Sequence, residues 1–228
     1  MTLSLVKPTR VLCVSNDHFE LATLSASLRL NGINIVGEAS NLVLADNLLR
    51  KVVPDIVVLE IQPYISETVR FLREARKLIP NLGIVITTKC PDFRLIGLNE
   101  KDIPERAQVL LTRSLSNLSV LTDALDKSIN EGESQIGINW IYDNLLHDYA
   151  DKYNKLRELT DIQVETLRLV AQGFSNSEIA RLRFVSEKSV EQIVARIAQQ
   201  LEIPTERSKN LRVNLAAEYF AWLGAPRR

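Results

Sequence analysis

The sequence predicts an α/β domain with a doubly wound, five-stranded parallel sheet, followed by a linker helix and a small all-α domain. The first observation behind this prediction is a series of apolar, strand-length stretches rich in Val, Ile and Leu, separated by segments with helical spacing. The second is a pair of helix-start signals placed close together in the last third of the chain. The five predicted strands are Arg10–Val14, Ile33–Glu38, Asp55–Ile61, Gly83–Thr88 and Ala107–Thr112.

Strands that alternate with helices indicate a parallel sheet with helices on both of its faces. Uninterrupted apolar runs, such as Ile56 to Leu59, are typical of strands that are buried on both sides. We therefore expect three parts, which are an α/β domain over residues 8–130, a linker helix over residues 131–158 and a helical domain over residues 159–228.

The composition, with 46% hydrophobic and 25% charged residues, is that of an ordinary soluble globular protein. No apolar run reaches the roughly 18 residues that a membrane span needs, and the start lacks the pattern of a signal peptide, so we expect a cytoplasmic protein. Cys13 and Cys90 form no CxxC pattern and are expected to stay reduced. His18 and His147 form no metal-ligand cluster, so neither a metal nor another cofactor is expected.

Several polar side chains stand where predicted strands end. Ser15, Asn16 and Asp17 follow the first strand, Glu60 lies near the end of the third, and Thr87 lies near the end of the fourth. In an open parallel sheet the functional crevice lies beyond the carboxyl ends of the strands. These residues are therefore expected to lie close together.

The stretches "RVLCVSND", "VGEASN" and "PDIVVLEIQP" resemble the receiver domain of bacterial response regulators, over roughly residues 8–130. The resemblance implies a site in which an acidic pair after the first strand helps to hold Mg²⁺ and an Asp ending the third strand accepts phosphate. A Thr or Ser would end the fourth strand and a Lys the fifth. In this sequence the five positions hold Ser15, Asn16, Glu60, Thr87 and Thr112, with Asp17 and Arg113 as immediate neighbours. Only the fourth position keeps the residue type that the family uses.

We expect these residues not to support phosphorylation. Mg²⁺ is usually held by one or two carboxylates together with phosphate oxygens and water, whereas Ser15 and Asn16 are neutral. Glu60 is one methylene longer than Asp, and misplacing a reacting group by about 1 Å can cost on the order of 10²-fold in rate. We expect a degenerate receiver in which Glu60 is either a solvated carboxylate or a fixed anion that imitates the phosphorylated state.

The segment Pro91–Arg106 stands where the family has a movable helix. It contains two prolines and only a short helical pattern. We expect either a shortened helix or a loop here.

An apolar stripe follows the polar interruption "GESQIG". Its residues recur at spacings of three and four, as on one face of a helix of about four turns. They are Tyr142, Leu145, Leu146, Tyr149, Tyr153 and Leu156. The stripe either packs against a flanking domain or pairs with a second copy of the chain, and we expect a homodimer.

The last third of the chain begins with two capping boxes. Thr160 is followed three residues later by Gln163, and Ser175 by Glu178, which predicts two helix starts. A third helix then follows after a tight turn. Helices joined in this way form a helix-turn-helix unit.

The third helix begins after Ser186, its predicted N-cap, and buries a face that includes Val190 and Ile197. Its opposite, polar face carries Lys188, Glu191, Gln192, Ala195, Arg196 and Gln199. In a DNA major groove, Gln binds adenine and Arg binds guanine or phosphate. Arg181 and Arg183, just before the third helix, add positive charge. By periodicity alone, the solvated face of a small helical bundle would explain the pattern nearly as well.

The segments "LVAQG", "SN", "EIA" and "FVSEKSV" resemble the DNA-binding domain of the LuxR/NarL-type regulators. The resemblance implies a receiver followed by a helix-turn-helix domain that binds double-stranded DNA. Residues 151–228 carry 13 Lys and Arg against 10 Asp and Glu, a net charge of +3, which suits such a partner. Three positions depart from the family, which commonly has a basic residue at Glu191, often a His at Ile193, and an apolar residue at Arg183.

Beyond Pro204 the sequence predicts a last amphipathic helix, which either closes the small core or mediates pairing. The sequence shows no pairing of a nucleophile with a base and no phosphate-cradling glycine loop, so we expect no enzyme. We expect a transcription regulator whose receiver responds to a protein partner, a small ligand or its own abundance. The rival hypothesis is a protein-interaction adaptor in which Glu191 has abolished DNA binding.

Overall fold

The structure is a computed structural model, and it describes residues 9–61, 66–112, 117–130, 137–141, 147–204 and 210–225. The chain forms two compact units. The first consists of residues 1–88 with 100–143, and the second of residues 89–99 with 144–228. The second unit thus includes a short segment that interrupts the first unit along the chain. We call this segment, residues 89–99, the strap.

The first unit is built on a six-stranded parallel sheet with the strand order β2-β1-β3-β4-β5-β6. The strands are β1 (Arg10–Val14), β2 (Asn34–Ala39), β3 (Ile56–Glu60), β4 (Gly83–Thr88), β5 (Gln108–Leu111) and β6 (Asn139–Ile141). The predicted doubly wound parallel sheet is confirmed. The predicted number of five strands is wrong, because β6 adds itself to the outer edge of β5.

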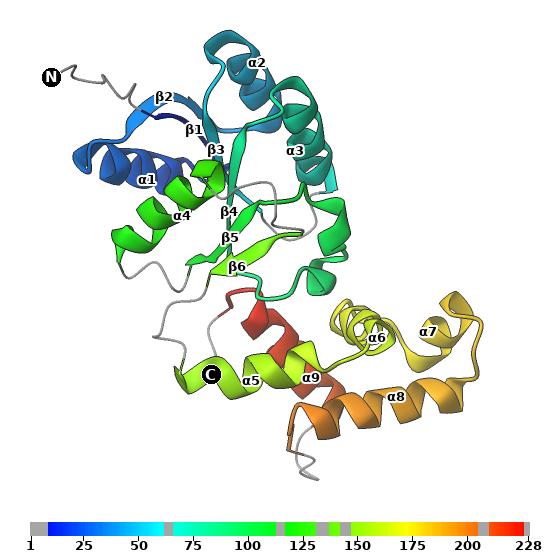
Figure 1. Ribbon diagram of the computed structural model, residues 1–228. Helices are drawn as coiled ribbons and strands as arrows, with labels where there is room; N and C mark the ends of the chain where they lie inside the picture. The colour runs from blue at the N-terminus through cyan, green and yellow to red at the C-terminus, as the bar shows by residue number, and fades with distance from the viewer. Residues whose placement is uncertain are drawn as a thin grey trace, which may run out of the picture. The chain divides into compact units, whose positions relative to one another are not determined.

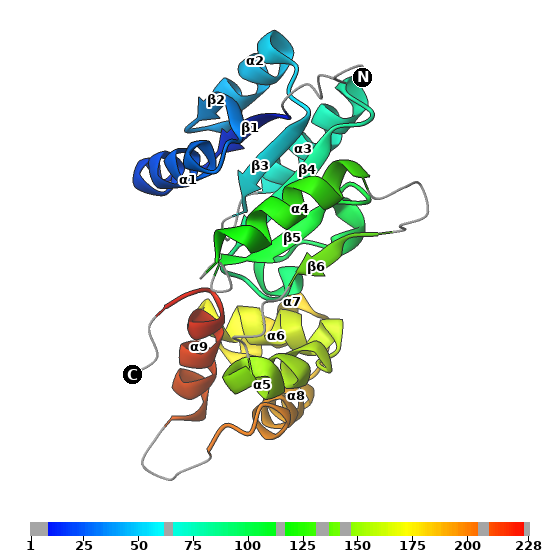
Figure 2. The same ribbon diagram turned by 60° about the vertical axis from the view of Figure 1, so that its left-hand side comes forward.

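Helices cover both faces of this sheet (Figure 1). The helices are α1 (His18–Leu30), α2 (Leu42–Val52), α3 (Ser66–Leu78) and α4 (Leu118–Asn130). α1 and α4 lie on one face, and α2 and α3 lie on the other, as the turned view also shows (Figure 2). Alternate strand residues face α1 and α4: Val11, Ile56 and Val85 join one buried cluster with Leu28 and Leu125 of these helices.

The family's movable helix is absent from the described part of Pro91–Arg106. Its place is taken by two short 3₁₀ helices, η1 (Phe93–Ile96) and η2 (Glu100–Asp102). Asp92 caps η1 by accepting a hydrogen bond from the Arg94 amide, and Gly97 ends it at φ 75°. The region is therefore remodelled, as expected, into two short 3₁₀ helices. Only η1 belongs to the strap.

The second unit is helical. Its helices are α5 (His147–Arg157), α6 (Asp161–Ala171), α7 (Asn176–Leu182), α8 (Glu187–Gln200) and α9 (Leu211–Trp222). Both predicted capping boxes are present, with Thr160 and Gln163 at the start of α6 and Ser175 and Glu178 at the start of α7. α6 packs along α9 (Figure 2). The Tyr153 ring of α5 lies 5.2 Å from the Trp222 ring of α9. The predicted helix-turn-helix domain is confirmed as a fold.

Each unit buries one cysteine, Cys13 in β1 and Cys90 in the strap, and neither forms a disulfide. Burial raises the pKa of the Cys13 thiol to about 11 and that of the Cys90 thiol to about 12. Both are therefore protonated and unreactive near neutral pH while they remain buried. Among the described helices, none combines the length and the apolar character that crossing a membrane requires.

Candidate nucleic-acid interface and receiver pocket

The helix-turn-helix unit is formed by α7, α8 and the turn between them. α7 ends at Leu182, and the chain then turns through Phe184, which adopts a left-handed conformation at φ 55°. Ser186 accepts a hydrogen bond from the Ser189 amide and starts α8. This cap satisfies one of the amides that a helix leaves unpaired at its start, and so fixes where α8 begins.

One side of α8 is held in the core of the second unit. Val190 and Ile197 have no exposed surface, and Val194 is 6% exposed. The side chains of Gln163 in α6 and Gln200 in α8 approach each other at 3.4 Å. The predicted division of faces is therefore present in the structure.

The opposite side of α8 is exposed to solvent. All six residues predicted for it are exposed, namely Lys188, Glu191, Gln192, Ala195, Arg196 and Gln199. Arg181 of α7 is exposed as well. A helix that buries one face and presents Gln, Arg and Lys on the other has the geometry needed to enter a major groove.

Arg183 is placed differently from the other predicted DNA-binding residues. Its Nη1 donates a hydrogen bond of 2.7 Å to the hydroxyl of Thr166, and its Nε lies 3.6 Å from the carboxylate of Glu165. Only 13% of its side chain is exposed. Arg183 thus ties the end of α7 to α6, which explains how a basic residue stands at a position that is usually apolar in the family.

Arg212 of α9 makes a second link within this unit, which no sequence pattern predicted. Its guanidinium donates to the backbone oxygen of Phe174 and to the side-chain oxygen of Asn176. It therefore connects the last helix to the turn between α6 and α7. On the outer side of the same helix, Val213 and Phe220 remain 63% and 43% exposed.

The predicted dimerisation stripe is described only in part. Tyr142, Leu145 and Leu146 lie outside the described residues, as does the side chain of Tyr149. Tyr153 and Leu156 are 8% and 0% exposed within a single chain. These two side chains pack inside the second unit, which was the other role left open by the sequence.

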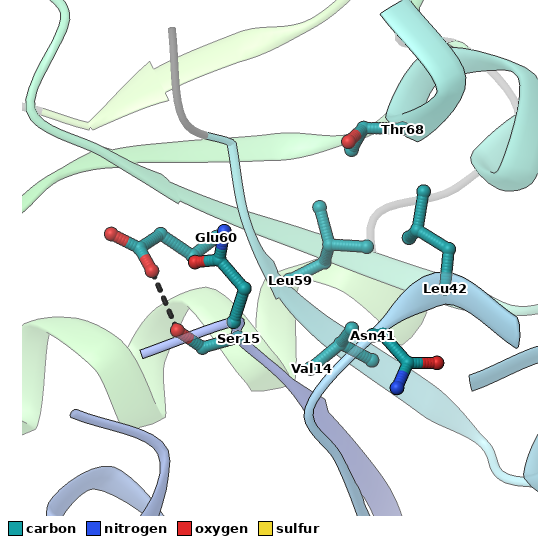
Figure 3. Close-up of a pocket in the computed structure, with 8 residues that line it drawn as sticks. Val14, Ser15, Asn41, Leu42, Leu59, Glu60 and Thr68 are labelled. Carbon is teal, nitrogen blue, oxygen red and sulfur yellow. Dashed lines mark hydrogen bonds between the residues drawn. The ribbon is translucent and has the colours of Figure 1, made fainter. Parts of the chain in front are cut away.

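The receiver pocket lies at the carboxyl edge of the sheet (Figure 3). The Ser15 hydroxyl after β1 donates a hydrogen bond of 2.6 Å to the carboxylate of Glu60 at the end of β3. Ser15 is buried, and Glu60 is half-buried. The carboxylate that the resemblance assigns to the phosphoacceptor position is therefore hydrogen-bonded to the residue that it assigns to a metal-binding position.

Two of the other predicted pocket residues, Asp17 and Thr112, form hydrogen bonds outside the pocket. Asp17 accepts hydrogen bonds from the amides of Phe19 and Glu20 and so caps α1. Thr87 stands opposite Glu60 in the register of β3 and β4, as expected. The Thr112 hydroxyl donates to the Thr88 backbone oxygen at 3.3 Å.

The pocket also contains residues that the sequence did not single out. Asn41, Leu42 and Thr68 line it together with Val14, Ser15, Asn16, Leu59 and Glu60. Asn41 caps α2 by accepting a hydrogen bond from the Leu44 amide. Its place just before a helical pattern was the only signal that could have found it. Within the described ranges, no three His, Cys, Asp or Glu side chains group into a metal-binding cluster.

Comparison with known proteins gives a family match in the second unit. Residues 157–208 match the family described as bacterial regulatory proteins, luxR family. The chain is also 25% identical over 198 residues to the response regulator protein VraR of Staphylococcus saprophyticus, covering 86% of this chain and 91% of that protein. It is 24% identical over 175 residues to the DNA-binding transcriptional activator DevR/DosR of Mycobacterium tuberculosis, covering 74% of this chain and 76% of that protein.

A solved structure has the same fold over nearly the whole chain. It is the two-component response regulator RcsB in complex with DNA, with a TM-score of 0.56 and 19% identity, covering 95% of this chain and 99% of that chain. A structure of two RcsB dimers bound to two parallel DNAs gives the same TM-score of 0.56 at 18% identity, covering 95% of this chain and 99% of that chain. The match to the luxR family thus covers the helix-turn-helix unit, in a chain whose similarity to response regulators extends over both units.

Proposed function

We propose that this chain is a bacterial, cytoplasmic regulator of transcription that binds double-stranded DNA through α8 and does not use phosphorylation of its receiver. The observation that carries the first part is the exposed polar face of α8 on a luxR-family domain. The names of the relatives support it, because they include a DNA-binding transcriptional activator. No catalytic activity is part of the proposal.

DNA contacts are assigned by position on α8 and α7. Gln192 and Arg196 are proposed to meet base edges or phosphates, and Lys188 and Arg181 to meet phosphates. Arg183 is left out, since Thr166 and Glu165 already engage it. Glu191 stands on the same face and opposes binding by repelling phosphates, so the neighbouring cations must outweigh it.

Independence from phosphate rests on the receiver pocket. The Glu60 carboxylate is bonded to Ser15, and Asp17 is engaged in capping α1. The carboxylates that would hold Mg²⁺ are therefore missing or occupied. The receiver would respond instead to a protein partner or small ligand.

We propose that the protein binds DNA as a dimer. Regulators with this domain meet paired half-sites one helical turn apart, and two linked weak contacts gain affinity together. Structures of RcsB dimers on DNA support this state for a protein of the same fold. The undescribed start of the dimerisation stripe and the exposed side of α9 are both proposed surfaces.

DNA binding is tested by measuring the affinity of the full chain for genomic fragments across a series of salt concentrations. If each protomer neutralises two or three phosphates, the log-log slope for a dimer is roughly −4 to −5, from about −0.9 per contact. Light scattering on the bound duplex reports whether two protomers are present. The absence of salt-dependent binding to any fragment would reject the regulator and favour the protein-interaction adaptor.

A further inference from the structure

The strap supplies part of the core of the second unit. Phe93 and Leu95 have no exposed surface, and η1 packs against α6. The fully buried Tyr219 of α9 donates its hydroxyl to the Leu95 backbone oxygen at 2.9 Å. The helical unit is therefore completed by residues that lie far from it in the sequence.

Arg94 of the strap closes the joint between α5 and α6. Its Nη1 donates a hydrogen bond of 2.8 Å to the backbone oxygen of Leu159, and its Nη2 reaches the backbone oxygens of Leu156 and Arg157 at 3.5 and 3.4 Å. Carbonyls at the end of a helix have no partner within the helix itself. The guanidinium of Arg94 acts as the hydrogen-bond donor for carbonyls at the end of α5. It also carries the positive charge that a helix C-terminus favours.

Two carboxylates hold this guanidinium in position. Asp92, which is buried, binds its Nε and Nη2 at 2.6–3.1 Å, and Asp161 in the first turn of α6 binds Nη1 at 3.0 Å. The hydrogen bonds with Asp92, followed by the charges of Asp92 and Asp161, raise the pKa of Arg94. Arg94 is thus charged at every relevant pH and links the strap to the start of α6.

The strap also fits closely against α6 at its far end. Gly97 has a φ of 75°, a region that L side chains rarely adopt. A Cβ atom at this position would collide with Nη1 of Arg168 in α6. An alanine at this position is therefore strained by its φ, and the end of the Arg168 side chain must shift to make room for it.

We propose that the strap is a latch that controls DNA binding: seated in the second unit it stabilises the α5–α6 joint, and its release lowers DNA affinity. The inference rests on the proposed function. The two ends of the strap continue directly into β4 at Thr88 and into η2 at Glu100. A partner or ligand that displaces either end acts on the strap through the chain itself.

The two cysteines allow this latch to be tested in the full chain. Cys90 is 1% exposed in the strap, and Cys13 is 0% exposed in β1 of the first unit. Release of the strap, or unfolding of the second unit to which it belongs, exposes Cys90, whereas unfolding of the first unit exposes Cys13. The rate of alkylation of each by iodoacetamide, followed by mass spectrometry, therefore reports the two exposures separately.

Arg94→Ala is the main variant, and Arg73→Ala is its matched control. Arg73 also makes two hydrogen bonds through its guanidinium, at 2.6 and 2.7 Å to Asp102, but within the first unit. In Arg94→Ala we expect alkylation of Cys90 to be at least about tenfold faster, and DNA affinity to fall about tenfold, because charge-assisted hydrogen bonds are lost. In Arg73→Ala, Cys90 should react as in the wild type, and Cys13 should keep its wild-type rate in both variants.

Gly97→Ala provides a second route to release if Arg94→Ala does not fold. It should accelerate alkylation of Cys90, and the added change Arg168→Ala should reverse part of this effect by removing the collision. An unchanged Cys90 rate in Arg94→Ala or in Gly97→Ala would reject the latch. So would equal acceleration of Cys13, or faster Cys90 alkylation with unchanged DNA affinity. Alkylation is measured without DNA, so a wild type that binds no DNA rejects the proposed function and leaves the release of the strap measurable.

Discussion

At the carboxyl edge of the sheet, the Ser15 hydroxyl and the Glu60 carboxylate are bonded to each other, whereas on α8 the side chains of Lys188 and Arg196 extend from an exposed face. Asp17 is likewise engaged in a helix cap. A site that binds an external group needs polar atoms that stay available until that group arrives. The first region uses its polar atoms in hydrogen bonds within the chain, and the second leaves them exposed to solvent.

The largest expected effect is a difference in protein stability between substitutions at two adjacent residues of α8. Ile197 has no exposed surface and Arg196 is exposed. Ile197→Ala should lower the free energy of unfolding of the second unit by about 2–5 kcal/mol, since it removes buried methylenes and leaves a cavity. Arg196→Ala should change it by less than about 0.5 kcal/mol. Urea denaturation followed by tryptophan fluorescence measures both, and equal losses would contradict the assigned faces.

The second effect concerns affinity for DNA. Arg196→Ala should weaken binding by about 1–3 kcal/mol on a verified target. A phosphate contact would weaken binding evenly across sequences and flatten the salt slope, whereas a base contact would relax specificity at one position. Gln192→Ala should chiefly change specificity, and Glu191→Lys should tighten non-specific binding.

Arg50→Ala is the matched control for the DNA measurements. Arg50 is an exposed arginine in α2 of the first unit, paired with Asp46 at 3.0 Å. The Arg50→Ala substitution should leave the affinity for DNA and the salt slope unchanged. If Arg196→Ala and Glu191→Lys also leave both unchanged, α8 is not the DNA-binding helix.

The third effect is a smaller loss of stability in the receiver pocket. Ser15→Ala should lower the free energy of unfolding of the first unit by about 1–2 kcal/mol, because it removes the hydrogen bond to a half-buried carboxylate. The neighbouring Asn16 is exposed, and Asn16→Ala should cost less than about 0.5 kcal/mol. Thermal unfolding of the two variants side by side tests this, and a neutral Ser15→Ala would contradict a stabilising hydrogen bond between Ser15 and Glu60.

The sequence predicted these structures where the signals were local. The capping boxes at Thr160 and Ser175 involve residues three apart, so their pattern can be recognised without knowing the fold. Strand β6 could not be found in this way, because it has only three residues and exists through pairing with β5. Trp140 and Asn139 are fixed there by Glu100 and Gln108, which are distant in sequence.

The packing of the strap and the contacts of Arg183 could not be predicted from the sequence for the same reason. Phe93, Leu95 and Ile96 are too few to show a helical or strand period, and their burial depends on α6 and α9. Arg183 has the charge of a DNA-binding residue, but its contact with Thr166 arises only once α6 and α7 are packed. Residue type indicates what a side chain is able to bind, and tertiary contacts decide whether it remains available.

The smallest effect expected is that of a phosphodonor on the receiver pocket. Acetyl phosphate with Mg²⁺ should give no labile phosphate adduct by intact mass, since Glu60 is bonded to Ser15 and Asp17 caps α1. Mg²⁺ alone should not stabilise the first unit either. A site with a Kd above about 0.1 M contributes less than about 0.1 kcal/mol at roughly 10 mM cation, because stabilisation follows RT ln(1 + [L]/Kd).

Glu60→Gln and Ser15→Asp test whether the receiver pocket accepts phosphate or Mg²⁺. Glu60→Gln should leave the mass spectrum unchanged, because there is no adduct for it to remove. Ser15→Asp breaks the bond to Glu60 and places a second carboxylate beside it, so Mg²⁺ should now raise the melting temperature of the first unit. A labile adduct in the wild type that disappears in Glu60→Gln would show that the pocket still transfers phosphate. In that case the polar groups at the sheet edge would be as available as those on α8.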